Sequence, residues 1–145
     1  MQFIDLKAQY RALKAEIDAT DALQIAYMVA RVGAGDAVFC PDMTFISSTE
    51  PANMFGATSV FCDITPDTYC INPSSLERQI QAVLAEGKLT PKVVVAVDIL
   101  GNPCDYDAIN AICEKYNLFL IEDAAQSFGA DYHGKKACAF GKIAT

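Results

Sequence analysis

The fold class follows from the apolar run Lys92-Val93-Val94-Val95-Ala96-Val97. Its β-branched residues favour a strand. The run shows no alternation of apolar and polar positions, which is typical of a strand covered on both faces by helices. It therefore predicts a parallel sheet inside an α/β domain.

Strands and helices are expected to alternate on both sides of this run. Hydrophobic periodicity and turn residues predict further strands at residues 37–40, 58–62 and 118–121. Helices are predicted at residues 5–31, as one helix or two, at 46–55 with Pro51 in the first turn, and after the caps Asn72 and Asp105. This order is typical of an α/β domain with right-handed crossovers, whose ligand crevice lies beyond the carboxyl ends of the strands.

The composition indicates a globular domain, or part of a larger one. The 145 residues are 52% hydrophobic and 20% charged, which is ample apolar mass for a core. The net charge of -7 argues against nucleic-acid and anionic-membrane partners, because no basic run could neutralise successive phosphates. No apolar segment is long enough to span a membrane and the N-terminus lacks a secretion signal, so a cytoplasmic location is expected.

Metal, disulfide and hydrolase chemistry are not indicated. The six cysteines are widely spaced without a CxxC pair, and the chain has one histidine, so free thiols are expected rather than zinc ligands or disulfides. That histidine, His133, lies in a polar, hairpin-like stretch without a nucleophile motif and is expected at the surface. Glycine-rich phosphate loops of the dinucleotide or P-loop kind are absent from the sequence.

Asp123 is the strongest candidate for a functional side chain. It follows an apolar strand directly, so its carboxylate is expected at the floor of the crevice and partly removed from water. Such a carboxylate needs a cationic partner, which a protonated ring nitrogen of a heteroaromatic cofactor or a metal ion would supply. The ordinary alternative is that Asp123 caps the following turn.

Three further residues could face the same ligand. Gln126 follows Asp123 by three residues and could hydrogen-bond a ligand oxygen, or be an ordinary turn residue. Phe45, in the polar turn behind the first strand, could stack on a flat ligand, or belong to the core, as such residues more often do. Thr20 could hold a phosphate at a helix N-terminus, or be a plain N-cap.

Six motifs in the same order resemble the DegT-type nucleotide-sugar aminotransferases. Together they run over nearly the whole chain and are more specific than a shared fold class would produce. They are Phe3-Ile4-Asp5-Leu6, Thr20-Asp21-Ala22-Leu23-Gln24, Gly33-Ala34-Gly35-Asp36, Thr44-Phe45-Ile46-Ser47-Ser48, Asp63-Ile64-Thr65-Pro66-Asp67-Thr68-Tyr69 and Ile121-Glu122-Asp123-Ala124-Ala125-Gln126-Ser127-Phe128-Gly129.

The resemblance implies an enzyme dependent on pyridoxal 5'-phosphate (PLP). Its fold would be that of aspartate aminotransferase (fold type I), three layers with a mostly parallel sheet and helices on both faces. The enzyme would work as a homodimer with a shared active site. It would move an amino group from glutamate to a nucleotide-linked keto sugar, for surface polysaccharides or secondary metabolites.

The resemblance also implies a role for each candidate residue. Asp123 would pair with the pyridinium nitrogen of PLP, Gln126 would contact its phenolic oxygen, and Phe45 would stack on its ring. Thr20 would hold its phosphate. An anionic partner keeps the ring nitrogen protonated, so that the ring accepts the electrons released when a proton leaves the substrate carbon.

The chain departs from the family pattern near residues 19–20. In the family several tens of residues separate the opening helix from the phosphate turn, whereas here Ala19 runs straight into Thr20. Residues 1–145 are therefore expected to be a partial large, cofactor-binding domain, its N-terminal portion with an internal gap. The small C-terminal domain of the family is expected to be absent.

A second departure concerns catalysis. The Schiff-base lysine of the family lies beyond the position matching Thr145, and Lys135, Lys136 and Lys142 are not expected to replace it. No catalytic residue is therefore predicted within the chain. The alternatives to an aminotransferase are a PLP-dependent sugar dehydratase on the same fold, in which a histidine replaces the lysine, and an inactive fragment or binding module.

Overall fold

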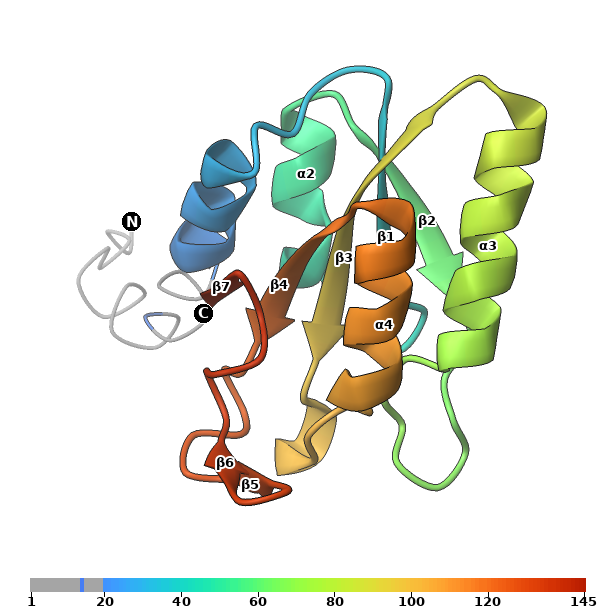
Figure 1. The fold of residues 1–145 in the computed structure, drawn as a ribbon. Coiled ribbons are helices and arrows are strands. Elements are labelled where there is room, and N and C mark those ends of the chain that lie inside the picture. Colours follow the sequence, from blue (N-terminus) through green and yellow to red (C-terminus); the bar gives the residue numbers. More distant parts are fainter. Residues whose placement is uncertain (1–13, 15–19) are drawn as a thin grey trace, which may run out of the picture.

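A five-stranded parallel sheet forms the centre of the described part of the molecule (Figure 1). The computed structural model describes Lys14 and residues 20–145. The strand order is β2-β1-β3-β4-β7. The strands are β1 (Asp36–Pro41), β2 (Thr58–Cys62), β3 (Thr90–Val97), β4 (Phe119–Asp123) and β7 (Ile143–Ala144), and a separate antiparallel hairpin holds β5 (Asp131–Tyr132) and β6 (Lys135–Lys136).

Helices cover both faces of the sheet, which gives three layers (Figure 1). On one face lie α3 (Pro73–Glu86) and α4 (Tyr106–Tyr116), and on the other lie α2 (Glu50–Met54) and a helix over 20–29. Two short 3-10 turns, η1 (Ile46–Ser48) and η2 (Ile99–Gly101), follow β1 and β3. The predicted α/β class with a mostly parallel sheet is confirmed. Within the described residues, no helix is both long enough and apolar enough to cross a membrane.

The apolar run that predicted the fold lies at the centre of the core. Every residue of β3 from Val93 to Val97 is buried, as expected of a strand between two helical layers. The apolar Leu84 of α3 is 52% exposed, unlike the buried Leu76, Ile80 and Val83 of the same helix. It lies about 100° around the helix from the buried Val83, past the edge of the buried stripe.

The helix ends follow the predicted caps. The Asn72 side chain accepts hydrogen bonds from two backbone N–H groups in the first turn of α3, at 2.9 and 3.2 Å. Asp105 accepts one in the same way, at 3.1 Å, from the first turn of α4. Gly87 and Asn117 end these helices in the left-handed conformation that glycine and asparagine tolerate best. Local sequence is therefore sufficient to begin and end both helices.

The helix predicted at residues 46–55 is interrupted, which corrects the prediction. Thr49 leaves the helical conformation (φ -127°, ψ -30°), and α2 then starts with Pro51 in its first turn. Proline has no N–H to donate and its ring clashes with the carbonyl four residues earlier, so a helix running through Pro51 is unfavourable. The break leaves η1 as a separate turn directly behind β1.

Two other boundaries differ from the predictions or lie outside the described residues. Glu122 and Asp123, predicted to follow the fourth strand, are the last two residues of β4 and pair in register with the end of β3. The helix predicted at 5–31 is described from residue 20 and ends at 29. Residues 1–13 and 15–19 are outside the described residues, so the opening helix and the gap near 19–20 stay predictions.

Candidate functional site

The strand order reverses between β1 and β3, which is where open α/β sheets bind their ligands. The chain steps from β1 to β2 on one side and then crosses to β3 on the other. A pocket of about 280 Å³ lies beyond this switch point. It is lined by Met43, Thr44 and Phe45 from the loop after β1, by Ile99 and Leu100 from η2, and by Gln126 from the turn after β4. The crevice predicted from the strand pattern is therefore present.

Phe45 lies on the wall of this pocket and is 60% exposed. It stands immediately before η1 with an extended backbone (φ -70°, ψ 148°). The interpretation of Phe45 as a core residue is therefore wrong. An exposed aromatic ring beside an apolar pocket is suited to stacking on a planar ligand, and that role stays a prediction.

Asp123 is the last residue of β4 and is 7% exposed. One of its oxygens accepts a hydrogen bond from the Ser48 hydroxyl at 3.1 Å, and the other accepts one from the backbone N–H of Ala125 at 3.3 Å. Burial raises the pKa of the Asp123 carboxyl, the nearby Asp98 adds to the increase, and the two hydrogen bonds oppose it. No lysine, arginine or histidine within 20–145 is seen in an ion pair with Asp123. A buried carboxylate with this environment would be stabilised by a cationic ligand.

Gln126 lies in the turn after β4 and its side chain spans the pocket wall. Its Oε1 accepts a hydrogen bond from the backbone N–H of Leu100 at 2.7 Å, which helps to hold Leu100 in a left-handed conformation (φ 57°). The amide oxygen of Gln126 is therefore already engaged in a hydrogen bond within the protein. The Nε2 group is then the donor that could meet an oxygen of a ligand.

Thr20 is placed at the same end of the molecule as the pocket. The helix over 20–29 runs antiparallel to the strands, so its N-terminal end points towards the carboxyl ends of the sheet (Figure 1). The helix is tied to the site by Tyr27, whose hydroxyl donates to the backbone carbonyl of Ser48. Thr20 itself does not line the pocket, and its role with a phosphate stays a prediction.

A buried carboxylate directly behind β3 joins the two loops of the site. Asp98 is fully buried and accepts hydrogen bonds from the hydroxyl groups of Tyr106 (2.6 Å) and Ser127 (2.7 Å) and from the backbone N–H of Cys104 (3.0 Å). These bonds fix the loop after β3 against the turn after β4, which carries Gln126. The position of Asp98 behind a strand was a signal, but its partners come from two separate segments, at residues 104–106 and at Ser127.

Glu122 is a second buried carboxylate that the sequence did not single out. It accepts backbone N–H hydrogen bonds from Cys138, from Phe140 (2.8 Å) and from Gly141 (3.0 Å). A Cβ at Gly141 would lie 2.8 Å from the backbone nitrogen and 2.9 Å from the Cβ of Glu122, so only glycine allows this approach. Glu122 thereby holds the returning loop that leads to β7.

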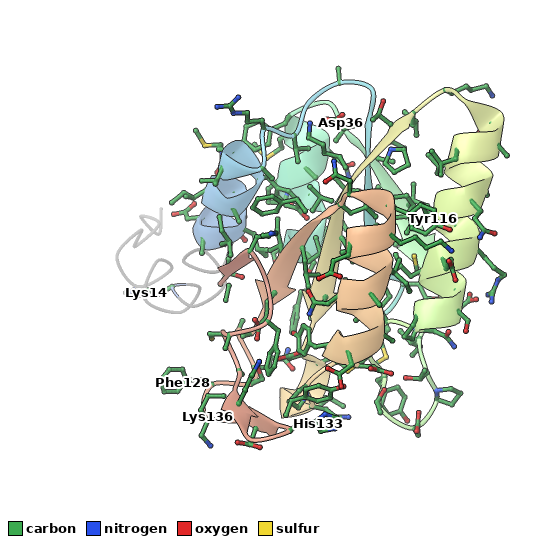
Figure 2. The ribbon with its side chains drawn as sticks, in the orientation of Figure 1. Lys14, Asp36, Tyr116, Phe128, His133 and Lys136 are labelled. Carbon is green, nitrogen blue, oxygen red and sulfur yellow. The ribbon has the colours of Figure 1, made fainter. Side chains whose placement is uncertain are left out.

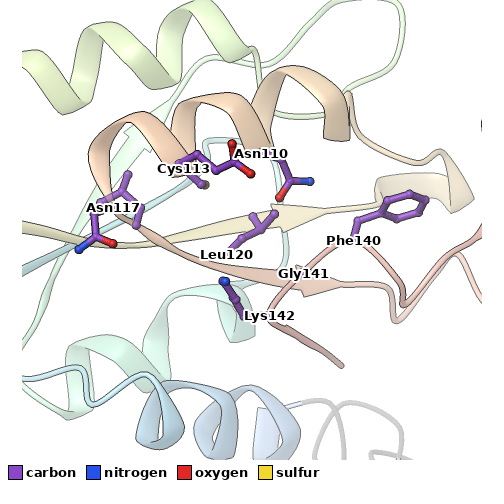
Figure 3. Close-up of a pocket in the computed structure, with 9 residues that line it drawn as sticks. Asn110, Cys113, Asn117, Leu120, Phe140, Gly141 and Lys142 are labelled. Carbon is purple, nitrogen blue, oxygen red and sulfur yellow. The ribbon is translucent and has the colours of Figure 1, made fainter.

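A larger hollow lies away from these residues. It measures about 440 Å³ and lies between α4, β4 and the loop before β7, with Asn110, Cys113, Leu120, Phe140 and Lys142 on its walls (Figure 3). None of the predicted site residues lines it. The smaller pocket at the switch point is the better candidate site, because it collects the loops that follow β1, β3 and β4.

The hairpin that carries His133 lies at the surface, as predicted. His133, Lys136 and Phe128 project from the end of the molecule that holds β5 and β6 (Figure 2). His133 has its Nδ1 atom 3.2 Å from a carboxylate oxygen of Asp107, and both side chains are largely exposed. Five of the six cysteines are buried and all six are free thiols, which agrees with the sequence prediction.

Comparisons with known proteins identify the family. The sequence profile of the DegT/DnrJ/EryC1/StrS aminotransferase family matches residues 13–145. The chain belongs to this family. The resemblance carried by the six motifs is therefore confirmed, and so is the fold class.

Individual relatives support the assignment of this chain to the family. It is 44% identical over 127 residues to the UDP-2-acetamido-2-deoxy-3-oxo-D-glucuronate aminotransferase of Pseudomonas aeruginosa, covering 86% of this chain and 33% of that enzyme. A DegT/DnrJ/EryC1/StrS aminotransferase of Brucella abortus has a similar structure (TM-score 0.85, 34% identity, 99% of this chain and 49% of that one). So does a proposed sugar aminotransferase of Streptococcus pneumoniae in its PMP form (TM-score 0.77, 29% identity, 87% and 34%).

The coverage shows how much of a family member is present. The chain spans about a third of the Pseudomonas enzyme and about half of the Brucella chain. Aminotransferases of this family are PLP enzymes, and PMP is the aminated form of that cofactor. The described site holds the residues that match the family motifs around Phe45, Asp123 and Gln126.

Proposed function

We propose that residues 1–145 are the N-terminal part of the cofactor-binding domain of a PLP-dependent aminotransferase. The whole protein would move an amino group from glutamate to a nucleotide-linked keto sugar, as a cytoplasmic homodimer with a shared active site. The observation that carries the proposal is Asp123, a buried carboxylate that lacks a cationic partner among the described residues and is linked through Ser48 to Thr44 on the wall of the switch-point pocket. The names of the relatives support the substrate class.

The residues of the site fit the cofactor. Asp123 would hold the ring nitrogen in its protonated form, Phe45 would cover one face of the ring, and the Nε2 group of Gln126 would donate to the phenolic oxygen. Thr20 and the N-terminus of its helix would attract the phosphate. When bound, the cofactor supplies an electron sink for the proton transfer at the substrate carbon.

The lysine that would bind PLP covalently is not assigned within this chain. The chain's own contribution to the reaction is therefore to bind the cofactor, orient its ring and keep the ring nitrogen charged. This division is consistent with a chain that spans about a third of its Pseudomonas relative.

Binding of pyridoxamine 5'-phosphate (PMP) tests the proposal, because PMP needs no lysine. We expect saturable binding of PMP to the 145-residue chain, followed by its absorbance or by calorimetry. Asp123→Asn should weaken binding at least about tenfold, since a charge-assisted hydrogen bond is lost.

Asp63→Asn is the matched control. Asp63 also follows a strand directly, but unlike Asp123 it is exposed and pairs with Arg78. Its variant should bind PMP as the wild type does. Absence of saturable binding to the wild-type chain, or equal losses in both variants, would contradict the proposed function.

A further inference from the structure

Ser48 makes the one side-chain hydrogen bond to Asp123 that is seen among the described residues. It is the last residue of η1, is fully buried, and is separated from Asp123 by 75 positions in the sequence. The contact exists because the loop after β1 folds over the end of β4. Ser48 is the last residue of the motif Thr44-Phe45-Ile46-Ser47-Ser48, but the sequence does not show that it contacts Asp123.

The hydrogen bonds around Ser48 have a defined direction. An ionised carboxylate only accepts, so the single O–H of Ser48 must donate to Asp123 at 3.1 Å. The Ser48 oxygen lies 2.7 Å from the hydroxyl oxygen of Thr44, and Thr44 must then donate to Ser48. A two-step relay of hydroxyl groups therefore runs from the pocket wall, where Thr44 lies, to the carboxylate of Asp123.

The backbone of Ser48 is held on two sides. Its N–H donates to the carbonyl of Phe45 at 3.0 Å, and its carbonyl accepts from the hydroxyl of Tyr27. Tyr27 is itself fully buried on the helix over 20–29. The Ser48 hydroxyl is thus fixed by the same elements that carry Phe45 and the predicted phosphate site at Thr20.

We propose that Ser48 is a positioning residue for Asp123, which holds the carboxylate in one orientation and stabilises its charged form towards the ring nitrogen of the cofactor. This inference rests on the proposed function. Ser48 occupies one oxygen of the carboxylate and the backbone of Ala125 the other, and each oxygen keeps a lone pair for a ligand. Without Ser48 the carboxylate is a stronger base and is held only by the backbone N–H of Ala125 among these contacts, so the proton shared with the ring nitrogen shifts towards Asp123.

The test uses PMP labelled with ¹⁵N in its pyridine ring, bound to the 145-residue chain. The ¹⁵N chemical shift reports whether the ring nitrogen carries a proton. In Ser48→Ala we expect the resonance to move from the protonated position of the wild type towards the neutral one, with about three- to tenfold weaker PMP binding. Thr49→Val is the matched control, since Thr49 is also buried but donates to the carbonyl of Ile46. Its resonance should stay at the wild-type position.

A second variant keeps the test decisive if Ser48→Ala does not fold. Thr44→Val removes the next hydroxyl of the relay at a half-exposed position, and a smaller displacement in the same direction is expected. An unchanged resonance in a folded Ser48→Ala, or in Thr44→Val when Ser48→Ala is unfolded, would overturn the role of Ser48 while leaving the proposed function intact. Failure of the wild-type chain to bind PMP would overturn both.

Discussion

At the scale of single residues, Asp123 shows an opposition between stability and function. Burial and the nearby Asp98 raise the pKa of its carboxyl above the value expected in the unfolded chain. A carboxyl with a raised folded pKa binds its proton more tightly in the folded state, so its contribution to stability falls as the pH rises from the unfolded pKa through the folded one. At neutral pH the charged form therefore destabilises the cofactor-free fold.

Replacing Asp123 should relieve this cost. We expect Asp123→Asn to raise the melting temperature of the cofactor-free chain at pH 7 and to bring it closer to the wild type at pH 4. Thermal unfolding of both proteins across this pH range checks the prediction. A variant that is less stable than the wild type at pH 7 would contradict the prediction, because it would mean that the buried charge of Asp123 stabilises the cofactor-free fold.

The free energy of unfolding of a Phe45 variant shows whether this ring faces a ligand or belongs to the core. Because Phe45 is 60% exposed, Phe45→Ala should change the free energy of unfolding by less than about 1 kcal/mol. The loss of ring stacking, on the order of 1 kcal/mol, should weaken PMP binding several-fold. Phe39, which is fully buried in β1, is the comparison: Phe39→Ala should cost about 3–5 kcal/mol in chemical denaturation. A comparable cost at position 45 would contradict the placement of its ring.

At the scale of elements, α3 and α4 each begin at a cap that the sequence shows. Asn72 caps α3 with two hydrogen bonds, so Asn72→Ala should lower the free energy of unfolding by about 1 kcal/mol. Asn72→Asp keeps an acceptor at the positive end of the helix and should be nearly neutral or slightly stabilising. Urea denaturation of the two variants measures the difference. Equal losses in both would mean that the cap contributes nothing.

The loop before β7 depends on Glu122. A glutamine there offers one acceptor oxygen, so its amide group would face either the N–H donor of Cys138 or the two N–H donors of Phe140 and Gly141. We expect Glu122→Gln to cost about 1–3 kcal/mol and to speed hydrogen exchange at residues 138, 140 and 141 more than in α3. Exchange followed by NMR or mass spectrometry resolves these sites. Uniform acceleration across the chain would indicate a global rather than a local effect.

At the scale of the whole molecule, the three lysines near the C-terminal end of the described residues, Lys135, Lys136 and Lys142, do not line the switch-point pocket. Lys142 lines the hollow between α4 and β4, and Lys135 and Lys136 are exposed on the β5–β6 hairpin. We therefore expect that borohydride reduction of the chain with PLP labels these three lysines weakly and that excess PMP does not suppress the labelling. Peptide mass spectrometry gives the sites. Strong labelling of one of them that PMP abolishes would assign the Schiff base to this chain.

The sequence by itself determined the layered α/β architecture and the end of the sheet at which a ligand site is expected. The unbroken apolar run of β3 predicted a buried parallel strand, the caps at Asn72 and Asp105 predicted two helices, and the apolar run before Asp123 predicted a further strand. Each of these signals acts over a few neighbouring residues, because burial on both faces and capping hydrogen bonds are local properties of the chain. That is why they could be predicted without coordinates.

The tertiary structure alone decided how the site is assembled. The hydrogen bonds from Ser48 to Asp123 and from Ser127 to Asp98 join segments that lie up to 75 positions apart. The exposure of the Phe45 ring likewise depends on how the loop after β1 packs. Such contacts depend on the strand order β2-β1-β3-β4-β7, which brings the ends of β1, β3 and β4 together. A hydroxyl or a carboxylate has no periodic pattern that reveals its distant partner, so these bonds follow from the packing of the sheet rather than from any stretch of sequence.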